Sequence, residues 1–455
     1  MPVIVVKPAG SLKGEITLPG DKSISHRALF ISGLAEGEST VEGFQESDDC
    51  LSTLKALLSY GIEIKKEGST VFVSGKGKSG FQEPSEIIDC RNSGTTMRLI
   101  SGIAAGLPFT TFLTGDQSLK RRPMARIAEP LRLMGATVLT RSNGLPPLAI
   151  TGGSLFGMEY RMPVASAQVK SCLLLAGLFA SGMTTIIEPA QTRDHTERML
   201  SYFGATLKYS SSLPIPSPPA GESLFRSSPL AGEVGWGGKS ISILGGQRLS
   251  GRQIKVPGDF SAAAYFLAAG SIVPNAEILI KDVGINPTRT AFLDVLLKMG
   301  ARIILQNRRE ENGEPVGDIL VKSSGGLKGV TVSGSLIPNL IDELPLLAVA
   351  GLSAEGKTEV NDAAELRVKE SDRIAATVSE LRRMGAEIEE KKDGFVLFGP
   401  QKLKGERVHS HLDHRIAMSL TIAALAAEGN TQVEEFGCVN VSFPQFFRTL
   451  YQLAY

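Results

Sequence analysis

Six segments of this chain share one pattern of polar and apolar positions. Each begins with a polar loop, continues as a helix that is apolar on every side, and ends with a short run typical of a β-strand. The pattern recurs at intervals of roughly 70–90 residues, which indicates an internal repeat. A helix that is apolar on all faces has to be buried. The segments span residues 20–41, 91–113, 165–187, 257–280, 341–360 and 412–433.

A second set of predicted helices has one polar face and lies between these segments. Each ends before a glycine, which suits the left-handed conformation of a helix C-cap, and a short β-branched strand follows. The helix at residues 125–134, for example, precedes Gly135 and a strand at 136–139. The predicted helices span residues 49–60, 125–134, 194–203, 289–299 and 371–384.

The repeat predicts an α/β protein built from six similar units. Three units can bury their apolar helices against one another and leave their sheets outside, so six units predict two domains of three. The length of 455 residues also exceeds that of a typical single core. Residues 210–238 break the repeat, because they are rich in Pro, Gly and Ser and contain the only tryptophan, Trp236. We predict that they form an inserted, mobile surface loop, with a substrate lid as the alternative.

Composition narrows the classes of function. Hydrophobic residues make up 42% and charged residues 21%, as in soluble globular proteins, and the net charge is +1. That balance favours neither nucleic acid nor a membrane surface as a partner. The N-terminus lacks the features of a signal peptide, and no apolar run has the length of a membrane span. The four cysteines form no C-x-x-C pair, so we expect a reducing, cytoplasmic location.

The polar loops place cations and amides directly before buried helices. In P-G-D-K-S-I-S-H-R (19–27), Lys22 and Arg27 flank a helix start, where free N–H groups and the helix dipole attract anions. If the six helices lie parallel within two domains, many N-termini point into one anion-binding cleft. A surface ion pair explains any single cation equally well. The pooled candidates are Lys22, Arg27, Asn92, Arg98, Gln168, Lys170, Asp342, Glu343, Lys369, Glu370, Arg373, Asp413 and Arg415, with Arg121, Arg122 and Arg193 at the starts of amphipathic helices.

Three motifs point to other functions and are set aside. G-L-S-A-E-G-K-T (351–358) matches a phosphate-binding loop, but a helix is predicted before it and a strand after it, the reverse of what that loop needs. G-K-G-K-S-G (75–80) matches a dinucleotide-binding pattern without a following helix. His409, His411 and His414 lack a matching set of acidic or cysteine ligands, so we expect no metal site.

Taken together, the loops resemble those of the 3-phosphoshikimate 1-carboxyvinyltransferases, the enolpyruvyl-shikimate-phosphate synthases of aromatic amino-acid and chorismate biosynthesis. The resemblance covers the whole chain except residues 210–238. Eight motifs occur in order: L-P-G-D-K-S-I-S-H-R-A (18–28), N-S-G-T-T-M-R (92–98), R-R-P-M (121–124), S-A-Q-V-K-S (166–171), T-R-D-H-T-E (192–197), I-D-E-L-P (341–345), E-L-R-V-K-E-S-D-R (365–373) and D-H-R-I-A-M (413–418).

The resemblance implies a fold and a reaction. The fold is the two-domain enolpyruvyl transferase fold, with three βαβαββ-type units in each domain, pseudo-threefold symmetry and a two-stranded hinge. We expect residues 1–19 plus 250–455 to form one domain and residues 20–249 the other. In the implied reaction the 5-hydroxyl of shikimate 3-phosphate attacks phosphoenolpyruvate, a tetrahedral intermediate forms and phosphate leaves. The resemblance implies these two small molecules as partners, no cofactor, and a cytoplasmic enzyme; we expect a monomer.

The resemblance also implies roles for individual residues. Asp342 matches the base that takes the proton of the attacking hydroxyl, Glu370 the proton donor to the methylene carbon, and Lys22 a residue shared by both substrates. The implied site for shikimate 3-phosphate comprises Lys22, Ser23, Arg27, Ser166, Ala167, Gln168, Arg193, Asp342 and Lys369. The implied phosphoenolpyruvate site comprises Lys22, Gly94, Arg122, Gln168, Arg373 and Arg415. We further expect the free enzyme to rest open, because clustered cations would repel one another.

Two features qualify the resemblance. Many relatives carry a lysine where Val441 or Ser442 stands, so that phosphate contact is in doubt. The stretch Ser166–Gln168 together with Arg193 resembles enzymes that tolerate glyphosate, whereas Gly94 resembles enzymes that glyphosate inhibits, and we predict inhibition. Two other functions are alternatives. The sister transferase acting on UDP-N-acetylglucosamine usually has a reactive cysteine in the loop at residues 115–124, and this chain has none there. A non-catalytic relative that binds phosphorylated ligands would be expected to lose Asp342 or Glu370, and both are present.

Overall fold

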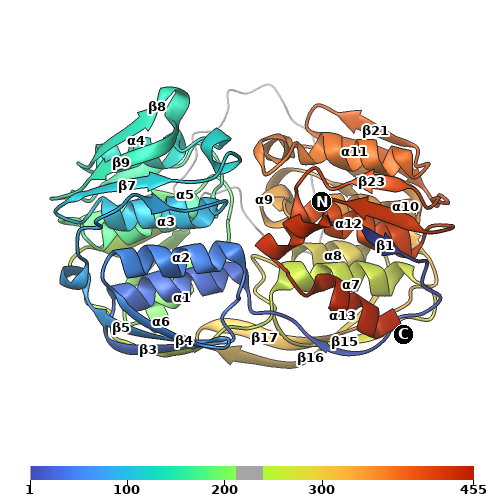
Figure 1. Ribbon diagram of the computed structural model, residues 1–455, viewed down its shortest axis with the longest axis horizontal. Coiled ribbons are helices and arrows are strands. Elements are labelled where there is room, and N and C mark those ends of the chain that lie inside the picture. The colour runs from blue at the N-terminus through green and yellow to red at the C-terminus, as the bar shows by residue number, and fades with distance from the viewer. Residues whose placement is uncertain (1, 212–238, 455) are drawn as a thin grey trace.

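The computed structural model describes residues 2–211 and 239–454 of the chain. The protein forms two lobes that lie side by side, with helices inside and small sheets around them (Figure 1). The first strands and the C-terminal half of the chain share one lobe, and the residues between them form the other (Figure 1).

The six apolar segments are confirmed as buried helices, three in each lobe. In one lobe α3 packs against both α1 and α5, and in the other α7, α10 and α12 pack against one another. Every residue of α10 is buried, which explains why its sequence shows no polar face. The helices are α1 (Lys22–Leu34), α3 (Gly94–Ala104), α5 (Ala167–Gly177), α7 (Phe260–Ile272), α10 (Leu344–Leu352) and α12 (His414–Leu425).

The amphipathic helices are also confirmed, and each is followed by a glycine with positive φ. That angle is 75° at Gly61, 109° at Gly135, 102° at Gly204, 91° at Gly300 and 90° at Gly385. Glycine therefore ends each helix in the left-handed conformation that the sequence predicted. These helices are α2 (Asp48–Ser59), α4 (Ala125–Leu133), α6 (His195–Tyr202), α8 (Ala291–Lys298) and α11 (Arg373–Arg383); α9 (Ile337–Leu340) and α13 (Phe446–Ala454) are additional.

The described strands form six small sheets, and five of them repeat one topology. In each, a parallel pair is extended by two antiparallel strands. In one lobe the sheets are β14 (Gln253–Lys255), β3 (Glu36–Glu42), β5 (Thr70–Lys76), β4 (Glu63–Glu67); β6 (Ile88–Asp89), β7 (Thr110–Thr114), β9 (Leu145–Thr151), β8 (Thr137–Arg141); and β10 (Glu159–Arg161), β11 (Met183–Ile187), β13 (Lys239–Leu244), β12 (Leu207–Ser211).

The second lobe contains two sheets of the same topology and one that differs. The sixth sheet places the N-terminal β1 beside β24 where the other sheets have a hairpin. The sheets are β16 (Arg302–Glu311), β17 (Glu314–Lys322), β15 (Glu277–Gly284), β2 (Lys13–Thr17); β18 (Leu327–Lys328), β20 (Ala354–Val360), β22 (Gly394–Gly399), β21 (Ile388–Lys391), with β19 (Thr331–Val332) beside β20; and β1 (Ile4–Val6), β24 (Thr431–Glu434), β23 (Arg407–His409).

Within the described residues the chain crosses between the lobes twice, and these two crossings pair with each other. Gly20 forms an antiparallel bridge to Gly258, and the Asp21 amide donates to the Pro257 carbonyl at 2.7 Å. A β-carbon at Gly20 would lie 1.9 Å from the Gly43 carbonyl oxygen, so only glycine fits this crossing. β14 pairs with β3 of the lobe formed by the middle of the chain, so the return crossing follows residue 255. The predicted domain division at 249/250 stays a prediction.

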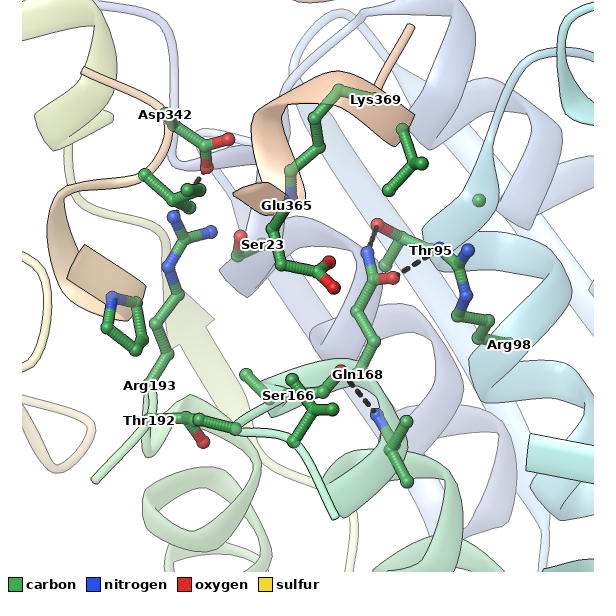
Figure 2. Close-up of a pocket in the computed structure, with 18 of the residues that line it drawn as sticks. Ser23, Thr95, Arg98, Ser166, Gln168, Thr192, Arg193, Asp342, Glu365 and Lys369 are labelled. Carbon is green, nitrogen blue, oxygen red and sulfur yellow. Dashed lines mark hydrogen bonds and ion pairs between the residues drawn. The ribbon is translucent and has the colours of Figure 1, made fainter. Parts of the chain in front are cut away.

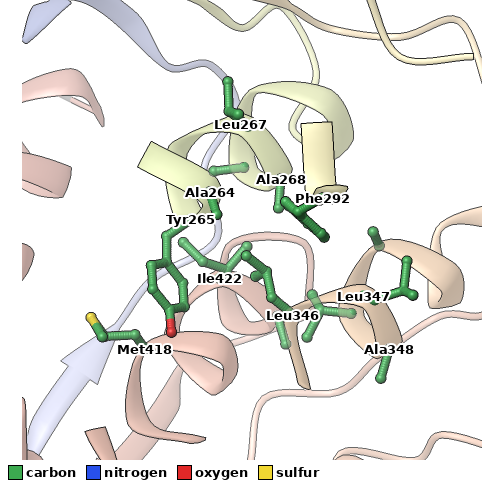
Figure 3. Close-up of a cluster of buried hydrophobic side chains, with 14 of the residues drawn as sticks. Ala264, Tyr265, Leu267, Ala268, Phe292, Leu346, Leu347, Ala348, Met418 and Ile422 are labelled. Carbon is green, nitrogen blue, oxygen red and sulfur yellow. The ribbon is translucent and has the colours of Figure 1, made fainter. Parts of the chain in front are cut away.

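Buried apolar side chains form two separate clusters, one in each lobe. Figure 3 shows part of one cluster, where Tyr265 of α7, Leu346 of α10 and Ile422 of α12 meet. Each core therefore contains the helices of three units. The contact between the lobes is left to their polar loops.

The predicted insertion begins later than its composition indicated. Ser210 and Ser211 are the last residues of β12 and pair with Ser240 and Lys239 of β13, so the predicted start at 210 is two residues early. Residues 212–238, on which the predictions of a mobile loop and a lid fall, lie outside the described residues. The two misleading glycine motifs are explained, since 351–358 joins α10 to β20 and 75–80 joins β5 to a single 3₁₀ turn.

Within residues 2–211 and 239–454, no single helix has the length and apolar character needed to cross a membrane. The segments Gly334–Leu340 and Leu344–Leu352 reach that length and character only together, and the chain bends by 103° between them.

Candidate active site

A cavity of about 350 Å³ lies between the lobes, and the N-termini of all six buried helices reach it. Lys22, Gly94 and Gln168 line it from one lobe, and Asp259, Asp342 and Arg415 line it from the other. The parallel arrangement predicted from the repeat is therefore confirmed. Helix N-termini bring free N–H groups and the positive end of the helix dipole, so the cavity attracts anions.

Side-chain caps fix these helix starts at the cavity wall. The Asp21 carboxylate accepts from the Ile24 amide at 2.9 Å, and Ser93 and Ser166 cap α3 and α5 through their hydroxyls. Asp259 and Asp413 do the same for α7 and α12. Each cap occupies one or two of the first amides, which holds the helix in place while its side chains face the cavity.

All fourteen residues that the family resemblance implied as site residues line this one cavity. They come from loops that are up to 393 residues apart in the sequence, from Lys22 to Arg415. Figure 2 shows several of them converging from the two lobes. They are Lys22, Ser23, Arg27, Gly94, Arg122, Ser166, Ala167, Gln168, Arg193, Asp342, Lys369, Glu370, Arg373 and Arg415.

Most of the cations of the cavity are paired with carboxylates, several of them across the lobes. Arg193 Nη2 lies 2.5 Å from Asp342 Oδ2, and Arg122 Nη1 lies 3.4 Å from Glu370 Oε1. Within one lobe, Lys22 Nζ lies 3.1 Å from Asp49 Oδ2. The lining residues include ten Lys and Arg but only six Asp and Glu, so these pairs reduce the positive charge of the cavity without cancelling it.

Asp342 is surrounded by guanidinium groups. Besides Arg193, Arg373 Nη1 lies 3.3 Å from Oδ1 and Arg415 Nη2 3.9 Å from Oδ2. Burial would raise the pKa of Asp342, but Arg193, Arg415 and the ammonium of Lys369 outweigh it and hold the pKa well below its ordinary value. Asp342 is therefore ionised in the unliganded protein.

Glu370 has a similar environment. Arg373 Nη2 lies 2.6 Å from Glu370 Oε2, and the Arg373 Nε also lies 2.8 Å from Asp413. Burial would raise the pKa of Glu370, but Arg373 and Arg122 hold it well below its ordinary value. The side chain of Glu370 is 21% exposed, whereas that of Arg373 is 2% exposed, so Arg373 is the fixed member of the pair.

Gln168, in the first turn of α5, contacts the first turns of α3 at the cavity wall (Figure 2). Its Oε1 accepts from Arg98 Nη1 at 2.5 Å, and its Nε2 donates to Thr95 Oγ1 at 2.9 Å. Gly94 precedes Thr95 at the start of α3, and a β-carbon there would lie 2.8 Å from Arg98 Nη1. The absence of a side chain at Gly94 therefore gives Arg98 its place.

Five of the pooled candidates are not among the cavity-lining residues, and three of these anchor arginines that are. Arg122 Nη2 donates to Asn92 at 2.7 Å, Arg373 pairs with Asp413, and Arg415 Nη1 lies 3.6 Å from Glu343 Oε1. Arg121 precedes Arg122 and does not line the cavity. Lys170 points into a buried cluster instead.

Sequence reasoning missed six charged lining residues, of which four are acidic and two, Arg126 and Arg289, are arginines. Asp49 pairs with Lys22, and Glu365 pairs with Arg126 at 2.6 Å across the lobes. Asp259 could have been found, because P-G-D-F (257–260) repeats the P-G-D-K (19–22) of the first loop. Asp49 and Glu365 carry no comparable signal, since they lie on helices whose partners are far away in the sequence.

The three C-terminal histidines serve separate interactions. His409 Nδ1 lies 2.8 Å from Glu434, His411 Nε2 lies 2.9 Å from Glu380, and His414 lines the cavity at the start of α12. In the described part of the chain, no group of three or more His, Cys, Asp or Glu side chains is arranged to hold a metal ion.

The position where many relatives carry a lysine contributes no charge to the cavity. Ser442 is 8% exposed, and its carbonyl accepts a hydrogen bond from Gln45 Nε2 at 2.7 Å. Neither Val441 nor Ser442 lines the cavity. The lobes are thus joined here by a neutral contact, and the phosphate contact of a lysine has no replacement from these two side chains.

Comparison with known proteins assigns the family. The family model of EPSP synthase (3-phosphoshikimate 1-carboxyvinyltransferase) matches residues 6–217 and 232–450. The 3-phosphoshikimate 1-carboxyvinyltransferase of Desulforudis audaxviator (strain MP104C) is 48% identical over 98% of each chain, and that of Synechococcus sp. (strain JA-3-3Ab) is 49% identical over 99% of this chain and 96% of its own.

A solved structure agrees with this result and with the predicted fold. The EPSP synthase of Acinetobacter baumannii superposes with a TM-score of 0.84 at 40% identity, covering 99% of this chain and 98% of that one. The family model leaves residues 218–231 unmatched, and these lie inside the predicted insertion. This chain therefore belongs to the EPSP synthase (3-phosphoshikimate 1-carboxyvinyltransferase) family.

Proposed function

We propose that the protein transfers the enolpyruvyl group of phosphoenolpyruvate to the 5-hydroxyl of shikimate 3-phosphate. The hydroxyl oxygen bonds to C2 of phosphoenolpyruvate, its proton goes to a base, and C3 gains a proton to give a tetrahedral intermediate. Loss of phosphate from C2 and of a proton from C3 then forms the enol ether. The observation that carries the proposal is the single cavity in which six helix N-termini and cations of both lobes converge.

We infer that shikimate 3-phosphate binds mainly to one lobe. Ser166 and the Ala167 backbone at the start of α5 provide a helix N-terminus for its phosphate, Arg193 provides a guanidinium group beside it, and Arg27 contacts the same substrate. Lys22, Ser23 and Gln168 complete this side. Asp342 and Lys369 contact the same substrate from the other lobe, so binding draws the lobes together.

Phosphoenolpyruvate carries a phosphate and a carboxylate, which suits a site rich in arginine. Arg122 and Gly94 belong to one lobe, and Arg373 and Arg415 to the other. Guanidinium groups donate pairs of parallel hydrogen bonds to such anions. Lys22 and Gln168 lie between the two substrate sites and contact both ligands in this assignment.

Asp342 is the proposed base, and its surroundings suggest how it gains basicity. In the unliganded protein its pKa is held down by Arg193, Arg415, Lys369 and Arg373 after the opposing effect of burial. Substrate anions bound to these same cations would weaken their attraction for Asp342, and the pKa of Asp342 would rise towards the range in which it accepts a proton.

Glu370 is the proposed acid, and the same argument applies to it. Its pKa is held down chiefly by Arg373 and Arg122, which are also the proposed partners of phosphoenolpyruvate. A dianionic ligand on these arginines raises the pKa of Glu370, so that the carboxyl can carry the proton that C3 requires. Closure of the lobes excludes water and aligns the hydroxyl with the double bond.

The test is phosphate release from phosphoenolpyruvate with shikimate 3-phosphate or with UDP-N-acetylglucosamine as acceptor. We expect release only with shikimate 3-phosphate. Asp342→Ala should lower kcat by about 10²- to 10⁴-fold, the usual contribution of a general base, with binding of phosphoenolpyruvate largely retained. Release with the UDP-sugar would favour the sister transferase, and no release with either acceptor from a folded protein would refute the proposal.

A further inference from the structure

Lys170 belongs to the S-A-Q-V-K-S motif but does not face the substrates. Its side chain is 1% exposed, and its Nζ lies 2.9 Å from Glu188 Oε2 and 2.6 Å from Glu197 Oε1. The two carboxylates are 2% and 1% exposed. These three residues, here called the buried triad, join α5, the end of β11 and α6.

The triad holds the segment that carries Arg193. The Thr192 hydroxyl donates to Glu188 Oε1, and the Thr192 carbonyl accepts from Lys170 Nζ at 3.4 Å. Thr192 and Arg193 both line the cavity, and Arg193 reaches across to Asp342. The triad thus fixes the hydroxyl and the carbonyl of Thr192. Thr192 directly precedes Arg193, whose guanidinium is assigned to the substrate phosphate.

The residues next to the triad hold Arg27. Arg27 Nε donates to Thr196 Oγ1 at 2.6 Å, and Arg27 Nη2 donates to Ser171 Oγ at 2.9 Å. Ser171 follows Lys170 on α5, and Thr196 precedes Glu197 on α6. Any shift between α5 and α6 therefore moves the two side-chain acceptors of Arg27 relative to each other; its third acceptor, the Ser23 carbonyl, belongs to α1 itself.

Charge connects the triad to Arg27 as well. The triad alone carries one negative charge, and together with the Arg27 guanidinium the group is neutral. Burial lowers the pKa of Arg27 to about 10, and the Glu197 carboxylate is the strongest influence opposing that shift. A buried cation needs such a partner, because isolated burial of a charge is costly.

We propose that Lys170, Glu188 and Glu197 are positioning residues that orient Arg27 and Arg193 for shikimate 3-phosphate. The inference rests on the proposed function, and it assigns to residues outside the cavity a share of the affinity for one substrate. Phosphoenolpyruvate is held by Arg122, Arg373 and Arg415, which do not contact the triad, so its affinity should be nearly independent of it.

Glu188→Gln separates positioning from simple charge. Removal of a carboxylate near an anion site strengthens anion binding if only the electrostatic field matters. A glutamine at 188, however, loses the charge-assisted bond to Lys170, and its NH₂ group cannot accept the Thr192 proton, so the Thr192 hydroxyl has to turn and become the acceptor for a weaker, neutral link. Positioning therefore predicts weaker binding of shikimate 3-phosphate, in the direction opposite to the field effect.

The experiment measures binding of shikimate 3-phosphate by calorimetry and the KM of each substrate by phosphate release. Glu188→Gln should weaken shikimate 3-phosphate binding about tenfold, with the KM for phosphoenolpyruvate changed less than about twofold. Thr192→Val removes the same link without changing charge and should weaken binding in the same direction, which covers the case that Glu188→Gln does not fold. Glu380→Gln is the matched control, since Glu380 is also 2% exposed and ion-paired but lies in the other lobe.

Unchanged or tighter binding of shikimate 3-phosphate in folded Glu188→Gln and Thr192→Val would overturn the inference. The proposed function would still stand in that case, provided that the wild-type protein turns over both substrates. Equal losses for both substrates would indicate a general loss of structure and would also overturn it. Failure of the wild-type protein to bind shikimate 3-phosphate would refute the proposed function and the inference together.

Discussion

Gly94→Ala tests the geometry of the proposed phosphoenolpyruvate site. A β-carbon at this position would lie 2.8 Å from Arg98 Nη1 and 3.4 Å from Arg122 Nη1. The first distance is too short for a stable contact, so Arg98 must move. Arg98 is not free to do so without loss, because its Nη1 donates to Gln168 at 2.5 Å. The methyl group therefore disturbs Gln168, which is assigned to both substrates.

The size of the effect follows from these contacts. Overpacking a fixed site costs about 1–3 kcal/mol, and loss of one charge-assisted hydrogen bond falls in the same range. If that cost falls on the bound state, the KM for phosphoenolpyruvate rises about 5- to 150-fold, since each 1.4 kcal/mol is tenfold. The position of the hydroxyl and of Asp342 is unaffected, so kcat should change much less than KM.

The assay is steady-state phosphate release with phosphoenolpyruvate varied, repeated with glyphosate. The wild-type protein should be inhibited by glyphosate, and the variant should lose sensitivity because its methyl group occupies the space next to the ligand. Gly325→Ala is the control, since a β-carbon there meets no atom within 4 Å. An unchanged KM would show that Arg98 moves at no cost, and a wild-type glyphosate inhibition constant far above the KM for phosphoenolpyruvate would refute the assignment of Gly94.

Three further predictions follow from other contacts. Glu314→Gln weakens the cross-lobe contact with His195 Nδ1, now 2.7 Å, and should raise the KM of both substrates about 3- to 10-fold in steady-state assays; unchanged values would show that the contact does not assist closure. The pKa of Glu370 is lower in the folded protein than its value of about 4.3 in the unfolded chain. Ionised Glu370 therefore stabilises the fold fully above that pH, and this contribution to the free energy of unfolding is lost as the pH falls through the pKa of the folded state. Denaturation of Glu370→Gln should therefore depend less on pH below about 5, and an identical pH dependence would contradict this. Native protein should resist iodoacetamide at pH 7, as read by mass spectrometry, because burial raises the pKa of its thiols, that of Cys438 to about 11; rapid labelling would contradict it.

Much of the fold could be predicted because the repeat places the same physical signal in each unit. A helix such as α10, apolar on every side, can only be a core helix, and a glycine such as Gly135 marks where an amphipathic helix ends. The sixth sheet could not be predicted, because β1 pairs with β24 from the opposite end of the chain. The pairing of β14 with β3 could not be predicted either, since a strand of three residues gives no periodic signal.

The candidate site was predictable where chemistry and chain position coincide. Cations at helix starts, such as Lys22 and Arg415, are visible as loop residues before apolar runs. Partners are not visible when they depend on distance in space alone. Arg126 and Glu365, for example, are 239 residues apart and meet only because the lobes face each other.

The paired carboxylates change the expected behaviour of the free protein. The expectation of an open resting state rests on cations that repel one another across the cleft, and it stays a prediction; three of the arginines, however, meet carboxylates of the opposite lobe there. Arg122, Arg126 and Arg193 each contact an acidic side chain of the opposite lobe. Substrate anions must therefore displace or share these partners. That exchange links binding to catalysis, because the carboxylates released from their cations include Asp342 and Glu370, whose pKa values must rise for proton transfer.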